Sequence, residues 1–312
     1  MLPYLIALIL LLQPVVTPNE CAVTLEFSYR FENTDEIRVV TSDAESLDFM
    51  GQRVVMNYTA EPVKENATLN WSIKGNGSFS ITYRIVSQRY ELKDFSGTIH
   101  EVPEDIKARY LGKNILSIGG TNIDFIDPGN QEIRNKAREI AGDDESIYGI
   151  SRKLYQWIVE NVGYNTKAET YPQGAAETLR KRSGDCDEQA ALFISMARSL
   201  GVPCFYMDGY VIDREGIYNA GHTWTGVIKY NEYGYEIFPV DTVYRELGVK
   251  SANKVFVDYD NGNNGYINSI YNDVRYWYND SDKVDIEYKV RCTDYITSSY
   301  PFYDSMKERR YF

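Results

Sequence analysis

The sequence predicts an α+β protein in which helices pack on an antiparallel β-sheet, preceded by a small β-sandwich domain. Residues 22–100 alternate apolar and polar side chains with the period of two that β-strands show. Residues 130–200 instead carry apolar side chains at helical spacing, and alternating runs return after residue 203. Helices followed by an antiparallel sheet are typical of the α+β class.

Length and charge narrow the function classes. The chain has 312 residues, more than one typical domain needs, and a formal net charge of −12. Nucleic-acid binding requires a basic surface, so the acidic balance argues against that class. The 27 tyrosines suit β-rich surfaces or faces that contact glycans, and the β-surface is the interpretation we adopt.

The N-terminus contains an apolar run, Leu5–Leu12, of signal-peptide length. The run is short for a membrane span, and no other stretch is long enough for one. No Lys or Arg precedes it and no Ala-x-Ala cleavage site is evident, so a cleaved signal peptide and an uncleaved anchor both stay open. We expect an extracytoplasmic protein, secreted or associated with the cell surface. Five glycosylation sequons agree with export, namely Asn57, Asn66, Asn70, Asn76 and Asn279.

The first β-region carries no evident chemistry. Val23–Phe31 and Phe79–Val86 alternate as strands, and Asn33–Asp35 and Lys74–Gly77 have the composition of turns. Short strands at this spacing predict a small sandwich of the immunoglobulin type.

Helical spacing takes over near residue 130. Asn130–Gly142 predicts an amphipathic helix that ends at a glycine. Apolar residues between Ile147 and Val162 form one stripe, and Pro172–Gly184 predicts a short helix. Further strands are expected near residues 204–213, 222–230 and 236–244.

The segment Arg182–Gly201 places a cysteine at the start of an apolar helix. Ser183-Gly184-Asp185 supplies turn and capping residues, and Ala190–Ala197 is apolar on nearly every side. Cys186 therefore stands at a helix N-terminus, where the dipole and free N–H groups favour thiolate over thiol. On this segment alone, a nucleophile and a buried structural cysteine are equally open interpretations.

A histidine and an aspartate follow in an informative order. The chain has only two histidines, and we interpret His100 as a surface or hinge residue at a domain boundary. His222 leads into one predicted strand and Asp241 ends the next. With Cys186 they would supply a nucleophile, a base and a carboxylate that fixes the base's tautomer.

At these residues the sequence resembles the transglutaminase-like superfamily. The stretches that look like its motifs are Gly184–Phe193, Ala197–Pro203, Gly221–Trp224 and Pro239–Thr242, with Leu154–Tyr164 similar to the helix and tyrosine upstream of its core. The resemblance covers roughly residues 105–245. It implies a papain-like thiol enzyme of a microbial exported type, with Cys186, His222 and Asp241 as its triad.

The predicted organisation has four parts: a signal peptide or anchor at residues 1–20, a β-sandwich at 21–104, the transglutaminase-like catalytic core at 105–250, and a Tyr-rich β extension of that core at 251–312. Strands are expected in the extension at Val255–Tyr259 and Val284–Arg291. Cys204 is expected to be buried and inert. Cys21 and Cys292 would pair only in an oxidising compartment, and sequence does not establish that connectivity.

The expected chemistry is attack of the Cys186 sulfur on an amide carbonyl, giving a thioester acyl-enzyme. His222 would move the proton and Asp241 would hold its ring. The backbone N–H of Cys186 is one oxyanion donor, and Tyr164 is either a second donor or a packing residue. Trp224 either shields the ion pair from water or fills the core.

The acyl acceptor decides the reaction class, and the motif does not separate the possibilities. Water gives a cysteine protease, isopeptidase or amidase, whereas a lysine amine gives a protein-glutamine gamma-glutamyltransferase. We favour hydrolysis of a protein or peptide, including a cell-wall or surface peptide, because small exported members of the resembled family are expected to be hydrolases. No cofactor and no metal site is indicated, and membrane contact is expected only through an uncleaved anchor. The alternative is a catalytically silent binding or scaffold protein that kept the fold.

Overall fold

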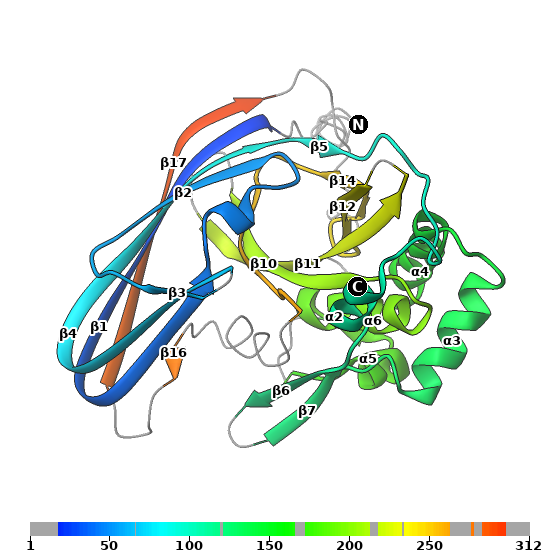
Figure 1. Cartoon of the computed structure of the whole chain (residues 1–312), viewed down its shortest axis with the longest axis horizontal. Helices are drawn as coiled ribbons and strands as arrows, with labels where there is room; N and C mark the ends of the chain where they lie inside the picture. Colours follow the sequence, from blue (N-terminus) through cyan, green and yellow to red (C-terminus); the bar gives the residue numbers. More distant parts are fainter. Residues whose placement is uncertain are drawn as a thin grey trace, which may run out of the picture.

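The computed structural model describes residues 18–65, 67–118, 121–165, 172–212, 218–232, 234–262, 276–277 and 283–297. Figure 1 shows a long twisted sheet on one side, a second sheet in the middle, and the helices on the far side of that second sheet. The mixed α+β class is confirmed.

The first sheet is antiparallel and has six strands: β1 (Pro18–Ser42), β2 (Gln52–Tyr58), β3 (Val63–Glu65), β4 (Thr68–Gln88), β16 (Tyr276–Trp277) and β17 (Lys283–Thr297). Strand β1 pairs with β4 along one edge and with β17 and β16 along the other. Side chains of β1 alternate between buried and more exposed positions from residue 21 to 32. The period of two in the sequence therefore marks one buried face, as predicted.

Two segments that were predicted to be turns lie inside strands. Strand β1 runs through Asn33–Asp35 and β4 runs through Lys74–Gly77. The two segments pair with each other, with Thr34 opposite Gly75 between shifts in register. Gly75 has φ +81°, which a glycine adopts without strain. The turn prediction was wrong because irregular residues of two strands face each other and are absorbed as bulges.

The second sheet is antiparallel and has the order β13-β12-β11-β10-β15. Its strands are β10 (Cys204–Ile212), β11 (Tyr218–Asn231), β12 (Gly234–Asp241), β13 (Glu246–Leu247) and β15 (Lys254–Tyr259). The strands predicted after residue 203 are confirmed, and Cys204 is buried as expected.

The helices are α2 (Glu104–Tyr110), α3 (Gln131–Ala141), α4 (Ile147–Asn161), α5 (Ala175–Lys181) and α6 (Cys186–Ser199). The remaining elements are short: η1 (Glu45–Leu47), β5 (Tyr90–Glu91), β6 (Asn114–Ile118), β7 (Thr121–Ile126), β8 (Gly163–Tyr164), β9 (Ser183–Gly184) and β14 (Val249–Lys250). Asn130 and Ser146 cap α3 and α4 through their side-chain oxygens, which explains why α3 begins after Asn130, as predicted, and why α4 begins at Ile147. Helix α6 is buried throughout its central turns.

Apolar side chains pack on both faces of the second sheet. On one face Val227 and Phe238 join the cluster that the helices form around Phe193. On the other face Trp224 and Phe256 join a cluster with side chains of the first sheet. A separate β-sandwich for residues 21–104 is not confirmed, because β1 to β4 belong to one sheet whose facing layer is the second sheet.

The stretch predicted as an extension of the core divides between the two sheets. Strand β15 pairs with β10 in the second sheet, whereas β17 pairs with β1 in the first. The register places Cys292 opposite Val23 and Cys21 opposite Tyr295. The Cys292 side chain is outside the described part of the chain, so its pairing with Cys21 stays a prediction, as do the domain boundaries.

Residues 1–17, most of the predicted signal peptide or anchor, lie outside the described ranges, as do Asn66 and Asn279. Asn57 is exposed on β2, and its glycosylation stays a prediction. Among the helices that the structure describes, none has the length and apolar character needed to cross a membrane.

Candidate active site

Cys186 is the first residue of α6, as predicted. The helix start is held by a capping box, in which Glu188 Oε2 accepts a hydrogen bond from the backbone N–H of Asp185 at 2.8 Å. Glu188 Oε1 also accepts from the backbone N–H of Gln173 at 3.2 Å. The position of the cysteine is therefore fixed by its own helix and by the segment before α5.

The end of β12 brings the cysteine to the strand that carries the histidine. The pairing of β11 with β12 ends near Thr225 and Val240, so the earlier part of β11 extends past the end of β12. There the backbone N–H of Thr223 donates to the Cys186 sulfur. Since Thr223 directly follows His222, the thiol lies against the residue next to the predicted base.

His222 and Asp241 form a buried hydrogen-bonded pair. His222 Nε2 lies 2.8 Å from Asp241 Oδ2, and the two residues are 5% and 2% exposed. Asp241 Oδ1 accepts from the backbone N–H groups of Val243 and Tyr244 at 3.0 and 2.9 Å. With Nε2 committed to Asp241, Nδ1 is the ring nitrogen left for the thiol.

Two aromatic rings enclose the imidazole. Trp224 is stacked on His222 with centroids 5.6 Å apart and is 1% exposed. The Tyr244 ring meets His222 edge-on at 4.8 Å. Trp224 also belongs to the cluster between the sheets, so it covers the histidine and fills the core at once.

Tyr164 lies beside the cysteine rather than in an open loop. Strand β8, which contains Tyr164, pairs in parallel with β9, and Tyr164 stands opposite Gly184. Desolvation of the hydroxyl and the proximity of Cys186 raise the pKa of Tyr164. The residue is 42% exposed, which leaves it accessible from solvent.

The site contains a cation that sequence reasoning missed. Lys254 Nζ lies 2.5 Å from Asp241 Oδ2, the oxygen that His222 also contacts, and 2.7 Å from Glu246 Oε2. Its side chain is 2% exposed. A lysine at the start of the apolar strand Lys254-Val-Phe-Val was the available signal, because a buried lysine is rare unless it is paired.

The family model of the transglutaminase-like superfamily matches residues 134–241. These residues are a transglutaminase-like domain. The match begins in α3 and ends at Asp241, so it spans Cys186 and His222. Glu246 and Lys254 follow the matched residues.

Of three similar solved structures, one shares the overall fold. A candidate cysteine protease from Cytophaga hutchinsonii has a TM-score of 0.59 at 16% identity, over 91% of this chain and 94% of that chain. The periplasmic domain of TgpA from Pseudomonas aeruginosa has a TM-score of 0.41 at 17% identity, over 70% of this chain and 88% of that chain. Red sea bream transglutaminase has a TM-score of 0.35 at 10% identity, over 73% of this chain and 48% of that chain. A search of the curated proteins found no match.

Within the transglutaminase-like domain, Asp241 is held as a carboxylate. Burial alone would raise its pKa, but Lys254 and His222 more than offset that effect and keep the pKa of Asp241 well below its usual range. Burial opposes the charge of Lys254 too, yet Asp241 and Glu246 raise the pKa of Lys254 above its ordinary value. Both groups are therefore charged at neutral pH.

The pKa of the Cys186 thiol is shifted in the direction opposite to the one predicted. Burial, together with the carboxyl groups of Asp187 and Asp185, raises the pKa of Cys186, and the Thr223 N–H opposes this only in part. Burial and the flanking carboxyl groups therefore oppose the thiolate that the helix dipole was expected to favour. The surroundings of Cys186 therefore favour the thiol over the thiolate.

The thiol belongs to one group of potential metal ligands. Asp185, Cys186 and Asp187 bring ligand atoms within 4.8 Å of one another, the one such group of three in the part of the chain described here. Burial and a hydrogen bond that protonated Asp185 donates to Asp187 raise the pKa of Asp185 well above its usual range. Protonated Asp185 has a partner in Asp187, and the group is not assigned to a metal.

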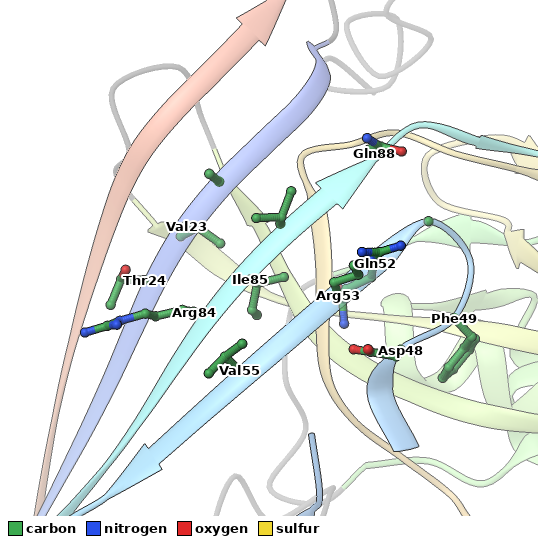
Figure 2. A pocket seen from close by; sticks show the side chains of 13 residues that line it. Val23, Thr24, Asp48, Phe49, Gln52, Arg53, Val55, Arg84, Ile85 and Gln88 are labelled. Atoms are coloured by element: carbon green, nitrogen blue, oxygen red, sulfur yellow. The ribbon is translucent and has the colours of Figure 1, made fainter. Parts of the chain in front are cut away.

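Other features lie away from this site. A cavity of about 1300 Å³ is found at one end of the first sheet, lined by β1, β2 and β4. Figure 2 shows Thr24 and Arg84 side by side in its wall, with Val55 on the neighbouring strand. None of the site residues lines this cavity. His100 is exposed and lies 3.1 Å from Glu145, which confirms that it is a surface residue.

Proposed function

We propose that this chain is a papain-like thiol enzyme that acts on amide bonds through Cys186, His222 and Asp241. The observation that carries the proposal is the buried His222–Asp241 hydrogen bond of 2.8 Å, on the strand whose next residue, Thr223, donates to the Cys186 sulfur. Nucleophile, base and orienting carboxylate thus come from α6, β11 and β12 and adjoin one another.

The reaction begins with a proton transfer. As the Cys186 sulfur attacks the carbonyl carbon, its proton moves to His222 Nδ1 and the carbonyl electrons move to oxygen. The imidazolium then gives that proton to the leaving amine as the C–N bond breaks, which leaves a thioester on Cys186. Asp241 holds the ring through Nε2 and stabilises its positive charge during the transfer.

The oxyanion needs donors near the sulfur. The backbone N–H of Cys186 belongs to the first turn of α6, where N–H groups have no partner within the helix. Tyr164 supplies a hydroxyl that is protonated, and therefore able to donate, at neutral pH. We assign both as oxyanion donors.

We favour water as the acyl acceptor, which makes the enzyme a protease, isopeptidase or amidase acting on a protein or peptide outside the cytoplasm. A transferase that uses a lysine amine follows the same steps as far as the thioester. A catalytically silent scaffold is favoured by one observation, the raised pKa of the Cys186 thiol.

Acylation with a p-nitrophenyl ester, followed by intact mass spectrometry and peptide mapping, tests the proposal. We expect an ester-derived acyl group on Cys186, with the acylation rate reduced about 10²- to 10⁴-fold in His222→Ala. Cys186→Ser should carry no such thioester, and the buried Cys204 should stay unmodified in every variant. Equal acylation of wild type and His222→Ala would overturn the proposal and favour the scaffold. Adding a primary amine then separates transfer from hydrolysis.

A further inference from the structure

Lys254 is enclosed by groups of the site. Its ammonium contacts Asp241 Oδ2 at 2.5 Å and Glu246 Oε2 at 2.7 Å, and it lies 4.1 Å from the centre of the Tyr244 ring. The lysine is 2% exposed, so these groups stand in for water. A buried ammonium needs such partners to remain charged, and here it has two carboxylates.

The Asp241 carboxylate is divided among four donors. Oδ2 accepts from both His222 Nε2 and Lys254 Nζ, and Oδ1 accepts from the backbone N–H groups of Val243 and Tyr244. An imidazolium at His222 would therefore share its counter-ion with a permanent ammonium on the same oxygen. The Lys254 ammonium therefore reduces the electrostatic attraction between Asp241 and an imidazolium at His222.

Glu246 fixes the lysine in place. Its Oε2 faces Lys254, while Oε1 accepts from the Ser251 hydroxyl at 2.5 Å. Strand pairing also sets Glu246 directly opposite Asp241. The ammonium is thus held by two strands and has little freedom to leave Asp241.

Among the described residues, Lys254 is the cation paired with the carboxylate that His222 contacts. The other titratable groups around His222 and Asp241, from the described elements that pack there, are Asp185 before α6, Cys186 and Asp187 of α6, Tyr155 of α4, Tyr164 of β8, Tyr206 and Asp208 of β10, Tyr244 and Arg245 after β12, and Glu246 of β13. The acidic groups of α6 disfavour a thiolate. Lys254 is the cation that shares Asp241 Oδ2 with the imidazole.

We propose that Lys254 is a positioning residue: its ammonium holds the Asp241 carboxylate at the His222 ring and withdraws part of its charge, so that Cys186 and His222 rest as a neutral pair. This inference rests on the proposed function, in which these two residues react together. The thiol proton moves to Nδ1 only as the sulfur–carbon bond forms. The raised pKa of the Cys186 thiol agrees with this resting state.

The test compares Lys254→Met/Glu246→Gln with wild type. The two substitutions remove one positive and one negative charge, so the net charge of the site is unchanged. Asp241 keeps its charge, and His222 becomes its only ionisable partner among these residues. We expect Cys186 to be alkylated by iodoacetamide about tenfold faster at pH 6 to 7, as a one-unit shift of its pH profile implies. Adding His222→Ala to the double variant should abolish the gain.

Controls separate positioning from loosened packing. Lys250→Met removes another buried lysine, whose ammonium contacts Ser87 and two backbone carbonyls, and should leave the alkylation profile unchanged. Cys204 is fully buried, so its alkylation would report unfolding. An unchanged or slower Cys186 reaction in a folded double variant, or a gain that persists without His222, would overturn the proposal.

Imidazole ¹⁵N spectra of the wild type test the same point without any substitution. The chain has two histidines, so exposed His100 serves as the internal reference. A neutral His222 ring protonated at Nε2 at pH 7 is expected, and an imidazolium would contradict the neutral pair. Neither readout requires turnover. If ester acylation fails while the alkylation and ¹⁵N results are as expected, only the proposed function is contradicted. If ester acylation succeeds while those two results are not as expected, only the role of Lys254 is contradicted.

Discussion

Lys250 and Lys254 lie four positions apart and are both buried, yet their surroundings differ. Lys254 is ion-paired with Asp241 and Glu246. Lys250 donates to the Ser87 hydroxyl at 2.7 Å and to two backbone carbonyls, and no carboxylate of the described residues forms an ion pair with it. Burial lowers the pKa of Lys250 to about 7, whereas the two carboxylates raise that of Lys254 against the same effect.

The difference shows how the fold treats two buried ammonium groups. A lysine removed from water either acquires a counter-charge or becomes easier to deprotonate. Lys250 connects β14 to Ser87 of β4, where polar but neutral partners suffice for a neutral amine. Lys254 adjoins the candidate active site, where its charge bears on Asp241 and through it on His222.

Replacing each lysine by methionine should give the largest contrast. Lys254→Met leaves two buried carboxylates without their shared cation and is expected to reduce the unfolding free energy by about 3–5 kcal/mol. Lys250→Met removes a group that is half deprotonated near pH 7 and should change stability by roughly 1 kcal/mol or less. Urea denaturation of both variants at pH 7 measures the two values. Equal losses would mean that the carboxylates do not distinguish the two sites.

Stability against pH should carry a second signature of Lys250. Between about pH 7 and the ordinary value of 10.5, the unfolded chain binds the Lys250 proton and the folded chain does not. Its contribution to the unfolding free energy therefore rises with pH across this window, with a slope of up to about 1.4 kcal/mol per pH unit. Below the window the penalty for a buried charge is fully present.

The Lys250 contribution is isolated by subtraction, because other groups titrate in the same window. Denaturation of wild type and Lys250→Met at pH 7, 8, 9 and 10 gives the difference between the two curves. We expect wild type to gain stability relative to the variant as pH rises. A flat difference would show that Lys250 stays charged in the folded protein, and the contrast with Lys254 would disappear.

Local sequence predicted the parts of the site that follow from local structure. Cys186 was placed at a helix start because turn residues precede it and an apolar run follows. His222 and Asp241 followed from the order of two short strands. Each inference needs only a few neighbouring residues, and the helices and strands of the core are confirmed at nearly the predicted bounds.

The missed parts depend on contacts between distant elements. Glu246 and Lys254 lie in strands at opposite ends of the second sheet's order, so their meeting at Asp241 is set by tertiary folding. The same applies to β17, which pairs with β1 from the other end of the chain. The raised pKa of Cys186 was missed because the dipole is a local effect, whereas desolvation depends on everything packed around the thiol.

The last prediction converts one lysine environment toward the other and should have the smallest effect. Ser87→Asp places a carboxyl group where the hydroxyl now meets Lys250 at 2.7 Å. The new ion pair should raise the pKa of Lys250 and flatten its contribution above pH 7. Stability at pH 7 should change by only about 1 kcal/mol, because desolvation of the added carboxylate offsets the attraction. Ser87→Asn, similar in size but uncharged, should keep the slope. If Ser87→Asp also keeps the pH slope, a nearby carboxylate does not explain the difference between Lys254 and Lys250. The difference would then come from the geometry that two strands impose on Lys254.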